Sequence, residues 1–158
     1  MQEPKLPTAA EIMNRAPLTF TPDVEITQAI ATLLKHGYSG APVVDGAGML
    51  LGVLSEKDCI RVLSTSAFHG APNGNVGDHM TPSPVAVAPS ADIFQLVFAF
   101  HDGTFRRVLV ADGGKLVGLI TRRDVLRALD ELRRAREKLP RTTTYDAIAA
   151  QHERDLND

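Results

Sequence analysis

The stretch GLITRRD, at Gly118–Asp124, has a counterpart earlier in the chain, GVLSEKD at Gly52–Asp58. Both stretches begin with glycine, continue through two aliphatic residues, place a hydroxyl residue fourth and end on aspartate. The match extends upstream, because GAPVVDGAG at 40–48 aligns with RVLVADGG at 107–114. The chain is therefore an internal repeat, and the repeated unit decides the fold.

The repeat divides the chain into five segments. A linker rich in Gly, Ser, Asn and Pro separates the two copies. We assign an N-terminal segment, a first unit, the linker, a second unit, and a C-terminal helix extension with a tail, at residues 1–9, 10–64, 65–76, 77–132 and 133–158.

Each unit opens with the same two elements. A short extended run, LTFT or VAVA, ends at a proline, where a helix cannot yet have begun. An amphipathic helix follows, with Asp23 and Ser90 predicted as its N-caps in the two units. Gly37 and Gly103 are predicted to end these helices.

A hairpin and a closing helix complete each unit. Two Val/Leu/Ile-rich strands flank an Asp-Gly turn, which is a hairpin signal. The closing helix is predicted to begin after Ser55 or Thr121, each of which can cap it. The order β-α-β-β-α predicts a mixed α/β (α+β) fold. Because one unit leaves an apolar sheet face uncovered, we expect the two units to pack as a pseudo-two-fold tandem pair with a shared core.

Composition limits the classes of function. The chain has 158 residues, 44% of them hydrophobic, and its formal net charge of −2 gives no general attraction to nucleic acid or anionic membrane. No apolar stretch approaches the roughly 20 residues of a membrane span, and the N-terminus does not read as a signal peptide. The single cysteine, Cys59, excludes an internal disulfide and fits a reducing compartment. We expect a soluble, cytoplasmic protein.

No catalytic or metal-binding pattern is visible in the sequence. The five histidines show no i,i+4 metal spacing. We find no nucleophile–base pair and no nucleic-acid reader motif. The sequence therefore predicts no catalytic residues and no metal site, and makes nucleic-acid binding unlikely.

Taken together, the repeated strand, helix and hairpin pattern with its Gly-x-x-Ser/Thr-x-x-Asp ending resembles the CBS domain, named after cystathionine β-synthase. The resemblance covers roughly Ala10 to Leu132 and includes IMNRAP aligned with HMTPSP. It implies a stand-alone CBS-pair protein that binds an adenosine-containing ligand between its two units.

The resemblance also assigns residues to parts of that ligand. It places Thr121 and Asp124, and equally Ser55 and Asp58, at the ribose, where a carboxylate can accept hydrogen bonds from both hydroxyls. It places these residues at the adenine: Met80, Thr81, Pro82, Val85, Met13, Asn14 and Pro17. It suggests these for the phosphate: Arg106, Arg107, Arg122 and Arg123.

The two units differ in charge. Gly40 stands where the second unit has Arg107, and Glu56-Lys57 stands where it has Arg122-Arg123. We therefore expect the second unit to hold the better site. For each Ser/Thr-x-x-Asp motif the alternative is purely structural, an N-cap followed by a first-turn acid.

The functional expectation is a non-catalytic regulatory module. Its ligand is expected to be an adenine nucleotide of the AMP, ADP or ATP class or a related adenosyl compound, with no tightly bound cofactor. Its partners are expected to be a second copy of the chain, in a homodimer, and an unknown effector protein, with no membrane partner. The alternative is a protein-interaction and dimerisation module whose nucleotide clefts are vestigial.

Overall fold

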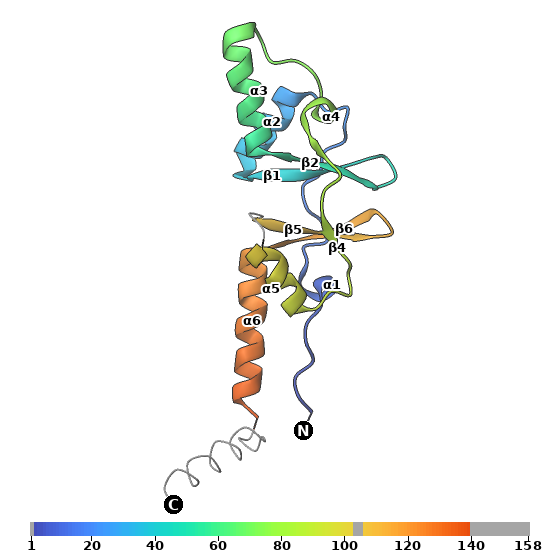
Figure 1. Ribbon diagram of the computed structural model, residues 1–158, viewed down its shortest axis with the longest axis vertical. Coiled ribbons are helices and arrows are strands. Elements are labelled where there is room, and N and C mark those ends of the chain that lie inside the picture. Colours follow the sequence, from blue (N-terminus) through green and yellow to red (C-terminus); the bar gives the residue numbers. More distant parts are fainter. Residues whose placement is uncertain (1, 103–105, 140–158) are drawn as a thin grey trace, which may run out of the picture.

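The computed structural model describes residues 2–102 and 106–139, which form two α+β units arranged one above the other (Figure 1). The fold class and the paired arrangement predicted from the repeat are both confirmed. Helices lie along one side of the pair and the hairpin tips extend from the other (Figure 1).

The elements follow the predicted order with short additional helices, except that the first unit, described throughout, has no opening strand, since Phe20 of the LTFT run makes only an isolated bridge with Val43. The first unit contains α2 (Ile26–His36), β1 (Gly40–Val44), β2 (Leu50–Ser55) and α3 (Glu56–His69). The second contains β4 (Ala86–Val87), α5 (Ile93–Asp102), β5 (Arg107–Asp112), β6 (Lys115–Thr121) and α6 (Arg122–Glu137). Three short elements lead into the units: α1 (Ala9–Ile12), α4 (Val76–His79) and β3 (Thr81–Pro82).

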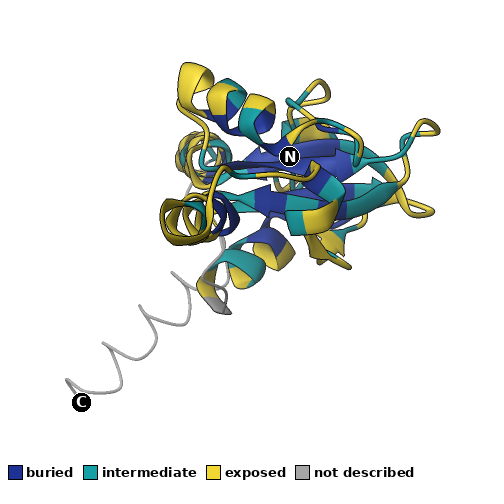
Figure 2. Cartoon of the chain, turned by 90° about the horizontal axis from the view of Figure 1, so that it is seen from above, coloured by how far each residue is buried: buried dark blue, intermediate teal, exposed yellow. Residues whose placement is uncertain are grey.

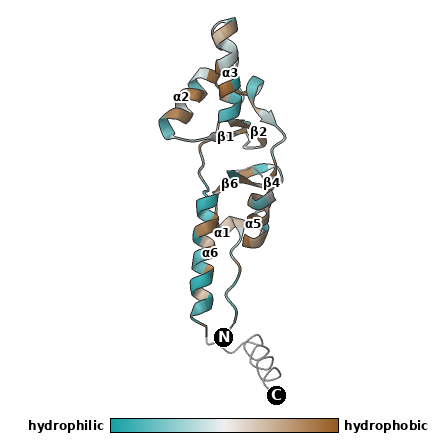
Figure 3. Cartoon of the chain, turned by 60° about the vertical axis from the view of Figure 1, so that its left-hand side comes forward, coloured by the Kyte–Doolittle hydropathy of each residue, from teal (hydrophilic) through white to brown (hydrophobic). Residues whose placement is uncertain are grey.

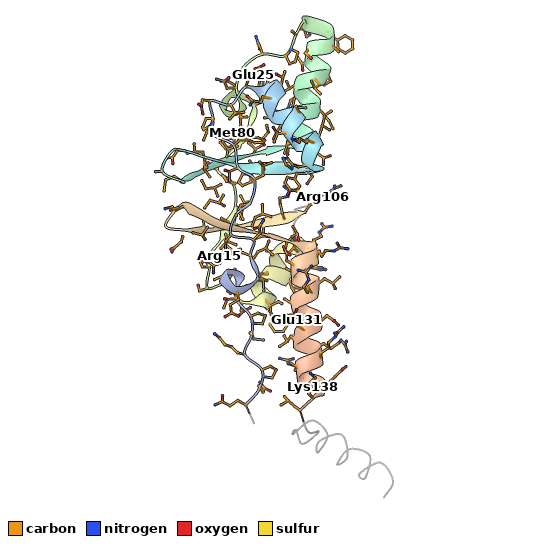
Figure 4. The ribbon with its side chains drawn as sticks, turned by 180° about the vertical axis from the view of Figure 1, so that it is seen from behind. Arg15, Glu25, Met80, Arg106, Glu131 and Lys138 are labelled. Carbon is orange, nitrogen blue, oxygen red and sulfur yellow. The ribbon has the colours of Figure 1, made fainter. Side chains whose placement is uncertain are left out.

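The segments that lead into the units are exchanged between them. β3 lies at the start of the second unit in the chain, yet it pairs antiparallel with β2 of the first unit, in a sheet ordered β1-β2-β3. In the same way Asn14, near the start of the first unit, pairs with Leu119 on β6 through two backbone hydrogen bonds of 2.9 and 3.0 Å. Figure 4 shows Met80 within the first unit and Arg15 beside the second. We call 13–14 and 80–82 the entry segments.

The glycine that opens each motif makes this exchange possible. A Cβ atom at Gly52 would lie 2.6 Å from the carbonyl oxygen of Thr81. A Cβ atom at Gly118 would lie 2.3 Å from the sulfur of Met13. Any larger residue would therefore collide with the entry segment of the other unit.

The hydrophobic core is divided between the units, which corrects the expectation of one shared core. The first cluster gathers around Ile26, Val43 and Leu54, and the second around Ile93 and Ile120. The exchanged segments complete both clusters, since Met80 packs on the first and Met13 on the second. Figure 2 shows the buried residues concentrated on the two sheets, with exposed residues on the outer faces of the helices.

A second connection joins the two hairpin tips. Met49 forms an antiparallel bridge with Lys115, flanked by hydrogen bonds from Leu50 N–H to Gly114 (2.9 Å) and from Leu116 N–H to Gly48 (3.0 Å). Backbone bonds therefore tie the units together at the tips as well as through the entry segments.

The helix starts confirm half of the capping predictions. α3 and α6 begin directly after Ser55 and Thr121, as predicted. Asp23 and Ser90 are not N-caps, because a turn after the proline delays both helices and α2 begins after Glu25. Asp92 performs this role for α5, since its Oδ1 accepts the N–H groups of Phe94 and Gln95.

The predictions for the helix ends and the apolar stripe have separate outcomes. Gly37 ends α2 in the left-handed conformation, with a φ of 66°, as predicted. Gly103 lies outside the described residues. On α2, Ile26, Ile30 and Leu33 are buried but Leu34 is 77% exposed, so the buried face of this amphipathic helix does not include every apolar residue of its sequence.

The entry-segment contact can be tested at Gly52. Gly52→Ala should lower the free energy of unfolding by about 1–3 kcal/mol, because the new methyl group meets a backbone oxygen that cannot rotate away. Urea denaturation measures this loss. Gly46→Ala is the matched control, since a Cβ atom there meets nothing within 4 Å and the change should be near neutral. Equal effects at the two glycines would contradict the close approach.

Candidate functional site

The two Ser/Thr-x-x-Asp motifs fold into the same local structure. Oδ2 of Asp58 accepts the N–H (2.9 Å) and the hydroxyl (2.8 Å) of Ser55, while the N–H of Asp58 donates to the Ser55 hydroxyl oxygen. Asp124 and Thr121 repeat these contacts, with 2.8 Å for both bonds to Oδ2. Each motif is a reciprocal helix cap, so the structural role anticipated for these residues is present in both units.

The surroundings of the two carboxylates differ. Asp58 is 3% exposed, and its Oδ1 accepts a hydrogen bond from Arg61 and a longer one, 3.4 Å, from the hydroxyl of Thr81. The side chain of Asp124 is 24% exposed, and Nη1 of Arg127 lies 3.7 Å from its Oδ1. The first carboxylate is thus buried and surrounded by donors, while the second is more open.

The exchange of entry segments decides which predicted residues meet. Met80 and Thr81, predicted for the adenine of the second unit, lie beside Ser55 and Asp58 of the first. Met13 and Asn14 pack against β6, which is the strand that leads to Thr121 and Asp124. The half-buried Pro17 follows them in the chain. Each predicted ribose pair is therefore next to the entry segment of the other unit.

A cavity lined by residues of both sheets has a volume of about 690 Å³. Its walls come from both units: Ser39, Gly40, Pro42, Val53, Glu56, Lys57, Ile60, Thr81 to Val85, Arg106, Arg107 and Leu109. Figure 4 shows Arg106 between the two sheets, near their helical side. The volume is in the range of small-molecule sites.

Arg107 crosses this cavity from one unit to the other. Its guanidinium donates hydrogen bonds to the carbonyl oxygen of Gly40 and to the hydroxyl of Ser39. Burial lowers the pKa of Arg107, opposed chiefly by the negative charge of Glu56. An arginine remains protonated in spite of such a shift, so the cavity contains a half-buried cation suited to an anionic group.

A smaller cavity of about 390 Å³ adjoins Asp58. It is bounded by α3, by the linker and by α4, with these residues in its walls: Asp58, Arg61, Val62, Thr65, Ser66, His69, Gly70 to Asn73, and Asp78 to Met80. Asp58 lines this cavity and Thr81 lines the larger one, and these two side chains are hydrogen-bonded to each other. The carboxylate of the first motif thus lines the smaller cavity and contacts the larger one only through Thr81.

The four arginines predicted for the phosphate do not gather in one place. Arg106 and Arg107 line the larger cavity together with Lys57 at the start of α3. Arg122 and Arg123 begin α6, on exposed positions, and line neither of the two cavities just described. The cations of the second unit are thus divided, and two of them line a cavity that Glu56 and Lys57 of the first unit also line.

Other chemistry finds little support in the described part of the chain. Within residues 2–102 and 106–139 there is no group of three His, Cys, Asp or Glu side chains placed to hold a metal ion. In the same residues no helix combines the length and the apolar character needed to cross a bilayer. Cys59 is buried, and burial is the main cause that raises the pKa of its thiol, which disfavours a nucleophilic role.

Sequence reasoning missed Arg61 and Lys57, although the repeat carried a signal for one of them. Arginine follows the motif aspartate by three residues in both units, as Arg61 and as Arg127. Residues at this spacing share a helix face, so the ion pairs could have been predicted. Lys57 could not, because the packing of the two units, which the sequence pattern does not specify, brings it to the cavity that Arg106 also lines.

Comparison with known proteins identifies two copies of one family. The family model described as CBS domain matches residues 9–65 and 76–131. The chain is 30% identical over 142 residues to the chloroplastic CBS domain-containing protein CBSX2 of Arabidopsis thaliana, over 73% of this chain and 60% of that protein. It is 36% identical over 124 residues to the zinc metalloprotease MJ0392 of Methanocaldococcus jannaschii, over 78% of this chain and 32% of that protein. The chain thus spans only part of the length of these curated relatives.

Solved structures agree with the fold. The crystal structure of CBSX2 in complex with AMP superposes with a TM-score of 0.69 and 29% identity, over 80% of this chain and 98% of that one. The CBS-domain protein ATU1752 of Agrobacterium tumefaciens gives a TM-score of 0.65 and 28% identity, over 77% of this chain and 92% of that one.

The unequal burial of the two carboxylates gives a stability test. Asp58→Asn should lower the free energy of unfolding by about 2–3 kcal/mol, because a buried carboxylate loses several charge-assisted hydrogen bonds. Asp124→Asn should cost about 1 kcal/mol, since its bonds lie nearer to solvent. Urea denaturation of both variants measures the difference. Equal losses would show that the contacts of Asp58 with Arg61 and Thr81 add nothing to stability.

Proposed function

The chain belongs to the CBS domain family, and we propose on that premise that it is a regulatory module that binds an adenosine-containing ligand. The observation that carries the proposal is the position of Asp58, a buried carboxylate that lines the smaller cavity and is hydrogen-bonded to Thr81, which lines the larger cavity together with Lys57, Arg106 and Arg107. The AMP bound by the relative CBSX2 supports the choice of ligand class.

The distribution of charge favours one orientation of this ligand. The ribose would lie at Asp58 and Thr81, which line one cavity each and are hydrogen-bonded to each other. The phosphate would extend into the larger cavity, toward Arg106, Arg107 and Lys57. The base would then occupy the smaller cavity, against Val62, Pro72 and Met80, with Ser66, Asn73 and His79 as polar neighbours.

With this orientation the first motif forms the better ligand site, whereas the sequence favoured the second motif. The first motif has the arginines of the second unit through the exchanged arrangement. In the second motif Gly40 replaces the arginine at the equivalent position, so we propose that Thr121 and Asp124 form the weaker site. Pro82 and Val85 would contact the phosphate side of the ligand rather than its base.

The ligand would act as a regulator of the protein and would not be chemically changed by it. The chain would act without catalysis and pass the state of the site to an effector protein, and the free thiol of Cys59 fits a reducing, cytoplasmic setting. A ligand bound at this site would touch both units at once. Its phosphate would compete for Arg107, which in this structure joins the second unit to Gly40 of the first.

The helical side favours a second copy of the chain as a partner. α5 and α6 expose Phe94, Phe98 and Leu126 at 49%, 68% and 68%. α3 exposes Ile60 and Phe68 at 66% and 86%. Figure 3 shows hydrophobic and hydrophilic residues interspersed along the ribbon of α6. Since a partner would bury these large apolar side chains away from water, we propose a homodimer through this side.

The same surface also supports the alternative function, an interaction module with vestigial clefts. That module would show no ligand effect on stability. A bound ligand at one hundred times its dissociation constant should instead stabilise the protein by about 2.7 kcal/mol.

Calorimetry with AMP, ADP, ATP, S-adenosylmethionine and NAD tests the sensing function. We expect at least one of these ligands to bind. Arg107→Gln should weaken the binding of a phosphate-bearing ligand by about 1.5–3 kcal/mol, whereas the affinity for adenosine should change little. Arg134→Gln, on the far part of α6, is the matched control. The absence of binding to all five ligands would leave the interaction module as the better account.

The homodimer can be tested by analytical ultracentrifugation. Phe98→Asp should weaken self-association about tenfold or more, because it places a charge on the apolar helical surface. A native chain that sediments as a monomer at high concentration would contradict the homodimer.

A further inference from the structure

Each motif aspartate is followed by an arginine on the same face of its helix. Arg61 follows Asp58 and donates a hydrogen bond to its Oδ1. Arg127 follows Asp124 at the same spacing, but its Nη1 lies 3.7 Å from Oδ1 and makes only an ion pair. The repeat therefore has the same two charges in both units and a closer contact in the first.

The acceptor positions of Asp58 are fully used. An ionised carboxylate has about four lone-pair positions. Two of them, on Oδ2, accept the N–H and the hydroxyl of Ser55. The other two, on Oδ1, accept Arg61 and Thr81. A ribose diol, which donates two hydrogen bonds, therefore has to displace existing donors.

The donors on Oδ1 are the ones that can leave. The bonds to Ser55 hold the first turn of α3, so breaking them would unwind the helix start. Arg61 is 67% exposed and regains water when it swings away. Asp58 is 3% exposed and lines the smaller cavity together with Arg61. A ribose that reaches Asp58 needs Oδ1 as the acceptor for its hydroxyls, and would find the guanidinium of Arg61 already bound to that oxygen.

We propose that Arg61 is a specificity-determining latch that occupies the ribose position of the first site. It neutralises the buried carboxylate when no ligand is bound and is released when the ribose hydroxyls replace it. The inference rests on the proposed function, because it assumes that Asp58 binds a ribose. Arg61 thereby reduces the part of the affinity that comes from the hydroxyls and leaves the phosphate and base contacts unchanged.

The latch is tested by comparing two ligands that differ only in the hydroxyls. The ratio of the dissociation constants of 2′,3′-dideoxyadenosine monophosphate and AMP measures what the diol contributes, and phosphate electrostatics cancel in it. Arg61→Met should raise this ratio about two- to fivefold, the scale of a solvent-exposed ion pair. Arg61→Lys, which keeps the charge, should leave it closer to the native value.

The second unit provides the matched control. Arg127→Met removes an equivalent charge from a pair without a hydrogen bond, and should leave the ratio unchanged. An unchanged or lower ratio for Arg61→Met, in a protein that binds AMP, would overturn the latch and leave the nucleotide function standing. A native protein that binds neither ligand would overturn the proposed function and the latch with it.

Discussion

The structure depends on the close approach of each entry segment to the sheet of the other unit. Gly52 and Gly118 permit this approach, since a Cβ atom at either position would lie within 2.6 Å of the opposing segment. β3 then completes the first sheet, and Met13 and Met80 complete the two cores. Neither unit keeps its own leading segment, so neither is a closed structure without its neighbour.

The same exchange makes the candidate site a product of both units. Ser55 and Asp58 come from the first unit, while Thr81, Arg106 and Arg107 come from the second. A ligand held by all of them would join the two units by additional contacts, separate from the backbone hydrogen bonds that already link the units. Binding would therefore change how firmly the units are held together, and that is the physical requirement for a regulatory signal.

Much of the local structure was predictable because short-range physics determines it. The caps at Ser55 and Thr121 and the end of α2 at Gly37 follow from side-chain chemistry within a few residues. The caps at Asp23 and Ser90 were wrong because a turn after each proline moved the helix start, a choice that depends on packing. The partner of each entry segment was not predictable, since the pattern of a strand does not specify which sheet edge it joins. The positions of Arg106 and Arg107 beside the first motif followed from that unpredicted pairing.

The duplication does not make two equal sites, because exchange pairs each motif with non-equivalent residues. The first motif meets Arg107 across the cavity, and the corresponding position for the second is Gly40. The first carboxylate is buried and held by Arg61, whereas the second is more exposed and lies 3.7 Å from Arg127. The proposed phosphate site with more cations thus coincides with the proposed ribose site whose carboxylate is more restrained. One ligand would then both bind its phosphate near Arg107 and displace Arg61 from Asp58 with its ribose hydroxyls. A ligand that has both groups would be favoured over one that has either alone.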